Sequence, residues 1–524
     1  MEKMLGVMLD CSRNAVMRVE TVKKYAEIIK QMGYNTLMLY TEDTYEVNNQ
    51  PFFGHLRGRY SKAEIKEMDS FCKEIGLELI PCIQTLAHLE NLFKWNSEYD
   101  EINDCDNILL ANEEKTYDLI EDMISTVSEC FSSRKIHIGM DEAYRVGTGK
   151  YQKKNGIEDR FDIINKHLHR VCEITDKYGF EPMIWSDMFC RLALDIENQY
   201  ENAENDKILE KAALPENITL VYWDYYSTDY NHYVQQIKTN KMFGRKVYFA
   251  GGAWSWRGLA PDNTFSIDTM KSAIRACNDC EVDGMLFTVW GDNGAECSKF
   301  AVLPSLMYAS QAVARNTNIE DIKNKFTQAT DCEFDDFMLL DMLDRPGGKH
   351  NDNPSKYLLY NDPFMGIRDY CCVESDNKFY ENLENQLKKV KCDSFFEEMF
   401  EHYKKLSKVL SIKAALGIKT RIAYLQGNKA ELGNIIEEYN LLLSSLQEFY
   451  DVFQKMWFKE NKPHGFEVQD IRIGGLMQRL VSCKKRLVQF VNNEISTIEE
   501  LEEPVLEKSN GHNFWDRIVT ANAL

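Results

Sequence analysis

Eight short runs of mostly apolar residues alternate with helix-like segments in the N-terminal part of the chain, and this pattern constrains the fold most. The intervening segments have helical periodicity, for example 19–32 and 61–75. In the second, Ser61 and Glu64 have the spacing of a capping box at a helix start. Apolar strands that alternate with amphipathic helices are typical of a parallel sheet covered by helices, and eight such units predict a (β/α)8 barrel. The predicted strands cover 5–10, 35–41, 77–83, 135–140, 181–186, 218–224, 246–251 and 283–289.

The main structural alternative is a doubly wound open sheet. Such a sheet normally carries a Gly-rich phosphate-binding loop after an early strand, and no such loop occurs in this sequence. We therefore expect an α/β protein whose residues 1–315 form a (β/α)8 TIM barrel.

Beyond residue 316 the strand signal stops and long helical segments begin. They cover 376–390, 395–416, 421–459 and 471–493. We expect an all-α C-terminal domain over 316–524 that takes no part in the chemistry. Its amphipathic helices are expected either to pack on the barrel or to form a homodimer interface.

The charge balance and the cysteines indicate which partners and which compartment to expect. The chain has 62 Lys and Arg against 83 Asp and Glu, a net charge of −21, which argues against nucleic-acid or anionic-membrane partners. No apolar run approaches the roughly 20 residues that span a bilayer, and residues 1–10 lack the features of a secretory signal. The 15 cysteines are scattered and odd in number, as expected for reduced thiols in the cytoplasm.

Polar and aromatic residues follow every predicted strand, at the end where (β/α)8 enzymes keep their active sites. Aromatic rings beside several carboxylates are typical of a sugar site, because the rings pack on sugar C–H groups and the acids bind hydroxyls. Some of the Trp residues could instead close the top of the barrel. In strand order these residues are Asp10 and Arg13; Glu42 and Asp43; Gln84 and His88; Asp141 and Glu142; Trp185 and Asp187; Trp223, Asp224, Tyr225 and Tyr226; Trp254 and Trp256; and Trp290 and Asp292.

The segment 135–144, KIHIGMDEAY, is the densest signal, because a predicted strand delivers Asp141 and Glu142 to the barrel mouth. Glycosidases that use two protein carboxylates place them on opposite sides of the scissile bond, roughly 5–9.5 Å apart. Adjacent residues at a strand end come from one side and point in divergent directions. They suit a mechanism with one acid/base and one orienting carboxylate, in which the substrate's acetamide is the nucleophile. Alternatively, the two acids merely cap a following helix.

KIHIGMDEA resembles the H-x-G-x-D-E signature of family 20 glycoside hydrolases, the β-N-acetylhexosaminidases, and the resemblance extends over the barrel. LDCSRNA resembles that family's first-strand arginine motif, PCIQTLAHLE its third-strand histidine segment and TVWGD its eighth-strand W-G-E motif. The resemblance implies an exo-acting, retaining, cofactor-free hydrolase of terminal β-linked GlcNAc or GalNAc. Glu142 would be its general acid and base, and Asp141 would orient the acetamide. Substrate binding would fall to Arg13, His88, Trp185, Trp223, Tyr225, Trp254, Trp290 and Asp292.

The chain departs from the family pattern in three places. The barrel begins near residue 1, so the family's usual N-terminal α/β domain is not expected. Asp292 stands where Glu is commoner, and GGAWSWRG replaces a seventh-strand motif that often holds a Tyr. Tyr225 is the expected substitute for the Tyr that binds the acetamide oxygen. These features most resemble the short, hexosaminidase D-like branch, which carries a helical C-terminal region.

Three further residues are expected to support the site. Glu42 and Asp43 would orient His88 by hydrogen bonding, the usual reason for placing an acid beside an imidazole. His137 lies inside a predicted strand, which favours a supporting or core position over a metal-ligand role.

We expect no metal and no other cofactor. Cys277-x-x-Cys280 lacks the second ligand pair of a zinc site, and His167-x-His169 is typical of a helix surface. Two other functions stay open on the residues alone. One is a non-catalytic sugar-binding barrel, and the other is an acetamido-sugar hydrolase of the O-linked N-acetylglucosaminidase type. Glu142 argues against the latter, because such enzymes usually carry a pair of aspartates.

Overall fold

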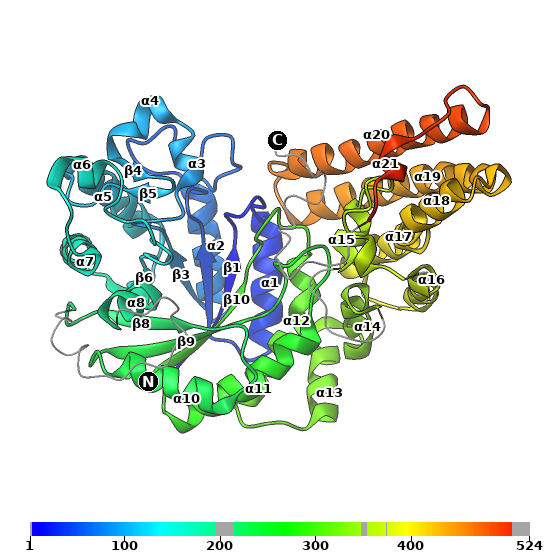
Figure 1. Ribbon diagram of the computed structural model, residues 1–524. Coiled ribbons are helices and arrows are strands. Elements are labelled where there is room, and N and C mark those ends of the chain that lie inside the picture. The colour runs from blue at the N-terminus through cyan, green and yellow to red at the C-terminus, as the bar shows by residue number, and fades with distance from the viewer. Residues whose placement is uncertain (1–2, 195–213, 347–353, 374, 506–524) are drawn as a thin grey trace. The chain divides into compact units, whose positions relative to one another are not determined.

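The computed structural model describes residues 3–194, 214–346, 354–373 and 375–505 (Figure 1). The chain forms two compact units. The first comprises Met1–Trp254, Thr264–Gly291 and Ser305–Lys325, and the second comprises Ser255–Asn263, Asp292–Pro304 and Phe326–Leu524. The domain division at residue 315 stays a prediction.

A closed barrel of eight parallel strands is the centre of the first unit (Figure 1). Around the barrel the strands follow the order β1-β10-β9-β8-β7-β6-β3-β2. Strand β1 closes it, because Leu9 lies opposite Leu39 on β2 and Val289 on β10. The predicted (β/α)8 barrel is confirmed. Its strands are β1 (Met4–Asp10), β2 (Thr36–Tyr40), β3 (Glu78–Cys82), β6 (Lys135–His137), β7 (Glu181–Trp185), β8 (Thr219–Trp223), β9 (Lys246–Gly252) and β10 (Gly284–Val289).

Helices follow the strands and surround the barrel (Figure 1). The predicted capping box is present, because Ser61 Oγ accepts the Glu64 N–H at 3.2 Å and Glu64 accepts the Ser61 N–H at 2.7 Å. A small hairpin, β4 (Asn103–Cys105) and β5 (Ile108–Leu109), lies in the connection from β3 to β6. The helices are α1 (Val19–Gln31), α2 (Lys62–Glu74), α3 (Glu90–Phe93), α4 (Asn96–Tyr99), α5 (Glu114–Cys130), α6 (Lys150–Asn155), α7 (Arg160–Lys177), α8 (Asp187–Leu194), α10 (Tyr230–Lys241), α11 (Asn263–Asp279), α12 (Leu303–Val313) and α13 (Ile319–Thr330).

The second unit is helical, as predicted for the C-terminal region. The single helix expected over 421–459 is divided, because Gly427 has a φ of 64° and ends α18. The N–H of Asn428 donates to the Ala423 carbonyl at 2.9 Å, which completes a left-handed C-cap. Asn428 then caps the next helix through the Glu431 N–H at 3.1 Å. The helices after α13 are α14 (Phe334–Met338), α15 (Pro354–Tyr360), α16 (Ser375–Leu387), α17 (Glu397–Lys413), α18 (Leu416–Leu425), α19 (Lys429–Glu460), α20 (Phe466–Val491) and α21 (Glu499–Glu502).

The helices and the cysteines bear on the sequence-based expectations of no membrane span and of reduced thiols. Across the described ranges, no helix combines the length and the apolar character needed to cross a bilayer. The cysteines whose side chains are described are free thiols, and most of them are buried.

Candidate active site

The strand predicted over 135–140 is shorter than expected. Strand β6 ends at His137, and Gly139, Met140 and Glu142 have φ values of 73°, 74° and 51°. Positive φ turns the backbone out of extended geometry, and residues other than Gly seldom adopt it. Backbone strain of this kind is common at functional sites.

Gln84 at the end of β3 holds this turn in place. Its Oε1 accepts the Met140 N–H at 3.2 Å, and its Nε2 donates to Asp141 Oδ1 at 2.8 Å and to Tyr40 Oη at 2.8 Å. A Cβ at Gly139 would lie 2.1 Å from Gln84 Oε1. Only glycine therefore fits at this position.

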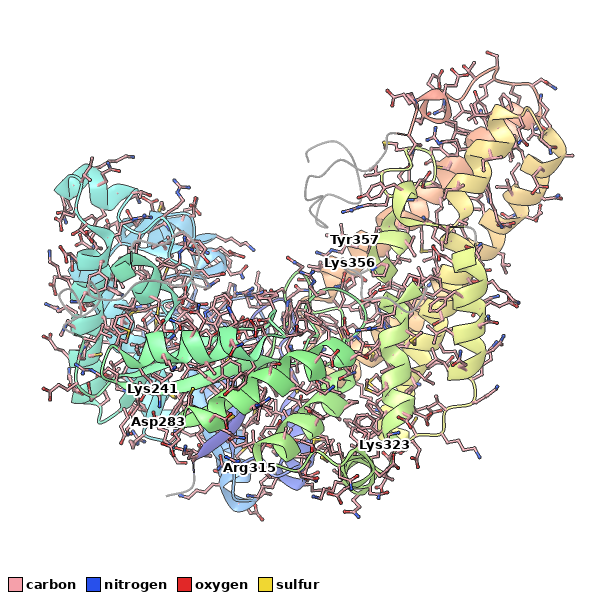
Figure 2. The ribbon with its side chains drawn as sticks, turned by 60° about the horizontal axis from the view of Figure 1, so that its bottom comes forward. Lys241, Asp283, Arg315, Lys323, Lys356 and Tyr357 are labelled. Carbon is pink, nitrogen blue, oxygen red and sulfur yellow. The ribbon has the colours of Figure 1, made fainter. Side chains whose placement is uncertain are left out.

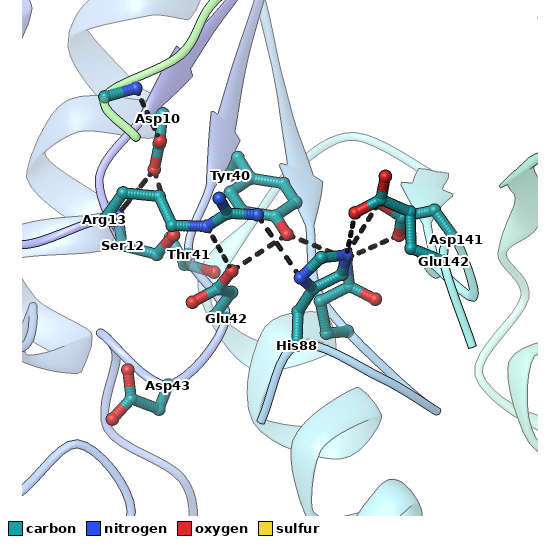
Figure 3. A network of polar contacts seen from close by, with 12 residues as sticks. Asp10, Ser12, Arg13, Tyr40, Thr41, Glu42, Asp43, His88, Asp141 and Glu142 are labelled. Carbon is teal, nitrogen blue, oxygen red and sulfur yellow. Dashed lines mark hydrogen bonds and ion pairs between the residues drawn. The ribbon is translucent and has the colours of Figure 1, made fainter. Parts of the chain in front are cut away.

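His88 contacts both of the adjacent acids through one ring nitrogen (Figure 3). Its Nε2 forms ion pairs with Asp141 Oδ2 at 3.1 Å and Glu142 Oε2 at 3.5 Å. The two carboxylates therefore converge on one imidazole, and the expectation that they diverge was wrong because the turn after β6 is not extended. The side chains of His88 and Asp141 are about nine-tenths buried, whereas that of Glu142 is 40% exposed.

The pKa values of these three groups move in different directions. Burial and the Asp141 charge raise the pKa of Glu142. Burial would also raise the pKa of Asp141, but the His88 charge and hydrogen bonds outweigh it and lower that pKa. Burial would lower the pKa of His88, but Asp141 outweighs it and raises this pKa to about 9. The geometry thus favours an ionised Asp141 beside a Glu142 that holds its proton more strongly than a free glutamate.

Arg13 extends the polar network across the ends of β1 and β2 (Figure 3). Its Nε donates to Glu42 Oε1 at 2.9 Å, and its Nη2 lies 3.3 Å from His88 Nδ1. The guanidinium carbon lies 5.8 Å from the centroid of the Trp290 ring. Asp10 fixes the turn below, since its carboxylate accepts the Arg13 N–H at 3.1 Å and the Gly291 N–H at 2.8 Å.

Glu42 and Asp43 do not make the hydrogen bonds to His88 that we expected. Glu42 is linked to His88 through Arg13, and Asp43 pairs with Arg57 at 3.3 Å. The reason is that Arg13 occupies the position between Glu42 and the imidazole. The acid that pairs with His88 comes from the turn after β6 instead.

Trp185 and His137 pack together beneath the site. Their ring centroids are 4.3 Å apart, and Trp185 also lies 6.3 Å from the Trp290 ring. His137 Nδ1 accepts the Gly139 N–H at 3.1 Å, so this histidine supports the turn after β6. Burial lowers the pKa of His137 to about 3, which keeps the ring neutral.

Tyr225 contacts three of the candidate Trp residues of the first unit. Its hydroxyl accepts the Trp290 indole N–H at 3.1 Å, and its carbonyl accepts the Trp254 indole N–H at 2.9 Å. The Trp223 ring stacks on Tyr225 with centroids 5.3 Å apart. Burial raises the pKa of Tyr225, and the charge of Asp141 acts in the same direction. Tyr225 thus lies within electrostatic reach of Asp141.

Two of the strand-end candidates belong to the second unit. Trp256 lies in Ser255–Asn263 and Asp292 in Asp292–Pro304, the segments that follow β9 and β10 in the sequence. The role of Asp292 in binding a sugar hydroxyl stays a prediction.

Tyr144 was not recognised from the sequence, yet it contacts one of the two acids. Its hydroxyl donates to Glu142 Oε1 at 3.2 Å. Both side chains line an open pocket of about 580 Å³ beside the acids. The other lining residues are His88, Glu90, Asp106, Asn107, Ile108 and Arg145. A Tyr two residues after the D-E pair was the only signal available in the sequence.

The weaker sequence patterns do not form a further site. His167 is buried, where its Nε2 contacts the Thr85 carbonyl at 2.9 Å, so the expectation of a surface position was wrong for this residue. Its neighbour His169 is exposed. Cys277 is buried in α11, and among the described residues no group of three or more acids, histidines and cysteines could hold a metal ion.

Known proteins with similar sequences include two called Hexosaminidase D. The one from Bos taurus is 26% identical over 246 residues, which cover 44% of this chain and 64% of that protein. The one from Homo sapiens is 26% identical over 227 residues, which cover 41% and 43%. The chain thus spans less than two thirds of the length of these curated relatives.

Solved structures that are similar to this chain include a beta-N-acetylhexosaminidase from Bacteroides fragilis NCTC 9343. It shares 19% identity and a TM-score of 0.45, over 59% of this chain and 65% of that one.

Two family profiles match the chain over separate regions. "Glycoside Hydrolase 20C C-terminal domain" matches residues 335–517. "Glycosyl hydrolase family 20, catalytic domain" matches residues 4–284, more than half of the 524 residues. With the closed barrel and the D-E pair after β6, this match shows that the chain belongs to glycosyl hydrolase family 20.

Proposed function

We propose that the chain is an exo-acting, retaining β-N-acetylhexosaminidase that releases terminal β-linked GlcNAc or GalNAc by substrate-assisted catalysis. The observation that carries the proposal is the convergence of Asp141 and Glu142 on His88, with the pKa values of the two acids moved apart. Such a separation suits one carboxyl to proton transfer and the other to charge stabilisation.

Glu142 is the proposed general acid and base. Its raised pKa and its partial exposure suit a group that must hold a proton and meet a substrate. It gives its proton to the glycosidic oxygen as the C1–O bond breaks. It then takes a proton from the water that attacks C1 in the second step.

Asp141 is the proposed partner of the substrate's acetamide. Its lowered pKa keeps it ionised, so it can accept the acetamide N–H and turn the carbonyl oxygen toward C1. The oxygen attacks C1 to form an oxazoline, and Asp141 stabilises the positive charge of that intermediate. Two successive inversions give net retention. Tyr225 is the proposed donor to the acetamide oxygen, a role supported by its contacts with Trp290 and Trp254.

The other contacts of the sugar follow from the same placement. Arg13 is proposed to bind ring hydroxyls, and Trp185 and Trp290 to form an apolar floor. A hydroxyl-binding role for Asp292 is proposed from the sequence resemblance alone. The open pocket beside Glu142 and Tyr144 would receive the leaving group. None of these steps requires a cofactor.

Steady-state hydrolysis of three aryl β-glycosides tests this function. The sugars are N-acetylglucosamine, N-acetylgalactosamine and glucose, and the Asp141→Asn variant purified in parallel is the control for contaminating activity. We expect cleavage of at least one acetamido sugar and almost none of the glucoside. Binding of N-acetylglucosamine without hydrolysis would support a sugar-binding barrel instead, and equal cleavage of the glucoside would contradict substrate assistance.

We also propose that the protein works in the cytoplasm as a homodimer. Free, mostly buried thiols support a reducing compartment. Apolar side chains left exposed on the second unit, such as Leu441 on α19 and Ile471 on α20, support contact with another copy. Light scattering after size-exclusion chromatography would measure the oligomeric state. A monomer at all protein concentrations would contradict the proposed homodimer.

A further inference from the structure

Asp187 is a buried acid at the site that the proposed mechanism does not use. It is the first residue of α8, directly after β7, and only 3% of its surface is exposed. One carboxyl oxygen, Oδ2, accepts the backbone N–H of Glu142 at 3.0 Å. This N–H belongs to a residue with a left-handed φ of 51°. Asp187 therefore fixes the peptide from which the Glu142 side chain projects.

The end of β7 is itself tied to the turn after β6. The Trp185 N–H donates to the Gly139 carbonyl at 3.2 Å. The Glu142 peptide is thus held from one side by β7 and α8, while Gln84 holds the preceding Met140 peptide from β3. Because the left-handed conformation is unfavourable for glutamate, it needs such contacts to persist.

We propose that Asp187 is a positioning residue for Glu142: by accepting the Glu142 N–H it aims the general acid at the glycosidic oxygen. This inference rests on the proposed function. It assigns no contact between Asp187 and the substrate. Proton transfer is sensitive to such aiming, because a misplacement of about 1 Å costs on the order of 10²-fold in rate.

The second carboxyl oxygen of Asp187 shows which charge state this arrangement favours. Oδ1 is buried, and no cation pairs with it among the described residues. Asp187 also lines a small cavity of about 10 Å³, near the lower limit for one water molecule. The other lining residues, Ser186, Cys190, Tyr222, Trp223, Gln236 and Asn240, include no Lys, Arg or His. An ionised carboxylate would thus lack a cationic partner on this side.

The charged and titratable groups that act on Asp187 all favour its neutral form. Burial, the Asp141 charge and the Glu142 charge raise the pKa of Asp187 to about 7, and they outweigh the hydrogen bonds from the Glu142 N–H and from Trp223, which lower it. Tyr144 and Cys190, the other titratable groups that interact with it, carry no positive charge. When Asp187 does ionise, it adds a negative charge that raises the pKa of Glu142 further.

Two substitutions separate positioning from simple packing. Asp187→Ala removes the acceptor of the Glu142 N–H, whereas Asp187→Asn keeps an oxygen that can accept it. Asp69→Ala is the matched control, because Asp69 is also buried and accepts the Ser132 N–H at 3.0 Å, just before β6 rather than after it.

The expected kinetic pattern depends on the leaving group. With an alkyl or sugar leaving group, Asp187→Ala should lower kcat about 10- to 100-fold at nearly constant KM. With an aryl leaving group, which needs less protonation, the loss should be several times smaller. Asp187→Asn should restore kcat at acidic pH, and its alkaline limb should move to lower pH because the extra negative charge near Glu142 is gone. Equal losses on both substrates, or no rescue by Asn, would overturn the inference.

Hydrogen exchange gives a readout that does not depend on activity. Exchange of the Glu142 amide should be faster in Asp187→Ala than in the wild type, protected again in Asp187→Asn, and unchanged in Asp69→Ala. An inactive wild type would refute the proposed function alone, since the exchange pattern would still report on the contact. Unchanged exchange in Asp187→Ala would refute the positioning contact even in an active enzyme.

Discussion

Two buried clusters of charge, one in each unit, differ in how completely their charges are paired. In the barrel, Asp141 and Glu142 share the single imidazole of His88. In the helical unit, Glu296 has a cation for each oxygen, because Oε1 pairs with Arg472 at 2.7 Å and Oε2 pairs with Lys356. Lys356 belongs to α15 and is labelled in Figure 2.

The clusters also differ in exposure. The side chains of Glu296 and Lys356 are at most 2% exposed, whereas that of Glu142 is 40% exposed. Burial lowers the pKa of Lys356 to about 8, against the attraction of Glu296. Buried charge alone therefore does not identify a catalytic site. Two acids that compete for one partner, with their pKa values moved apart and one acid open to a ligand, are the stronger sign of a reacting site.

The largest effect is expected from Glu142→Gln. Removing the general acid should lower kcat/KM by roughly 10²–10⁴-fold for substrates with poor leaving groups. Aryl glycosides should lose less, because their leaving oxygen needs less help from a proton. Kinetics on a matched alkyl and aryl pair measures the difference. Small and equal losses would show that Glu142 is not the acid.

Asp141→Asn should have the next largest effect. Without the negative charge, the oxazoline intermediate loses a stabilisation typically worth roughly 3–4 kcal/mol in a water-poor site. The loss should appear with alkyl and aryl leaving groups alike, unlike that of Glu142→Gln. Asp43→Asn is the control, because this buried acid pairs with Arg57 instead. Similar losses in both variants would contradict the role of Asp141.

Lys356→Met tests the helical cluster. Removing one partner from a buried ion pair should lower the free energy of unfolding by about 3 kcal/mol, because Glu296 keeps only Arg472. Its alkyl-to-aryl rate ratio should stay at the wild-type value.

Lys388→Met is the control for Lys356→Met, since Lys388 pairs with Glu384 while half exposed and should cost under about 1 kcal/mol. Chemical denaturation measures both variants. Equal losses in the two variants would contradict the claim that the buried Lys356–Glu296 pair contributes more to stability than the exposed Lys388–Glu384 pair.

His88→Asn should give the smallest change, a shift of the pH profile. The His88 charge lowers the pKa values of both Asp141 and Glu142. Without it both values rise, so the acidic and alkaline limbs of kcat/KM should move to higher pH, by about one unit. The exposed His169 supplies the control variant, His169→Asn. An unmoved acidic limb would show that His88 does not keep Asp141 ionised.

The barrel and the D-E pair could be predicted because they depend on local patterns. Strand runs repeat eight times, and Asp141 and Glu142 directly follow one of them. The partners of these acids could not be predicted. His88 pairs with Asp141 because the backbone turns at Gly139 and Met140, and Arg13 separates His88 from Glu42. No periodicity in the sequence signals either arrangement.

Other features depended on packing that the sequence does not display. In the sequence Asp187 is one of many strand-end acids. Its hydrogen bond to the Glu142 peptide depends on how β7 lies beside the turn after β6, which the sequence does not display. The break at Gly427 was missed because apolar periodicity continues on both sides of it. The two-residue spacing of His167 and His169 does not show which of them lies on the buried face of α7, where the His167 imidazole contacts the Thr85 carbonyl.

The most direct test of the central claim is a series of aryl β-glycosides whose 2-acetamido group carries zero to three fluorine atoms. Each fluorine withdraws electrons from the acetamide oxygen, so its attack on C1 becomes slower if this oxygen is the nucleophile. The account predicts that kcat/KM falls steeply along the series. Rates that do not change with fluorination, together with a covalent glycosyl adduct trapped on a protein carboxylate by a 2-fluoro sugar, would contradict it.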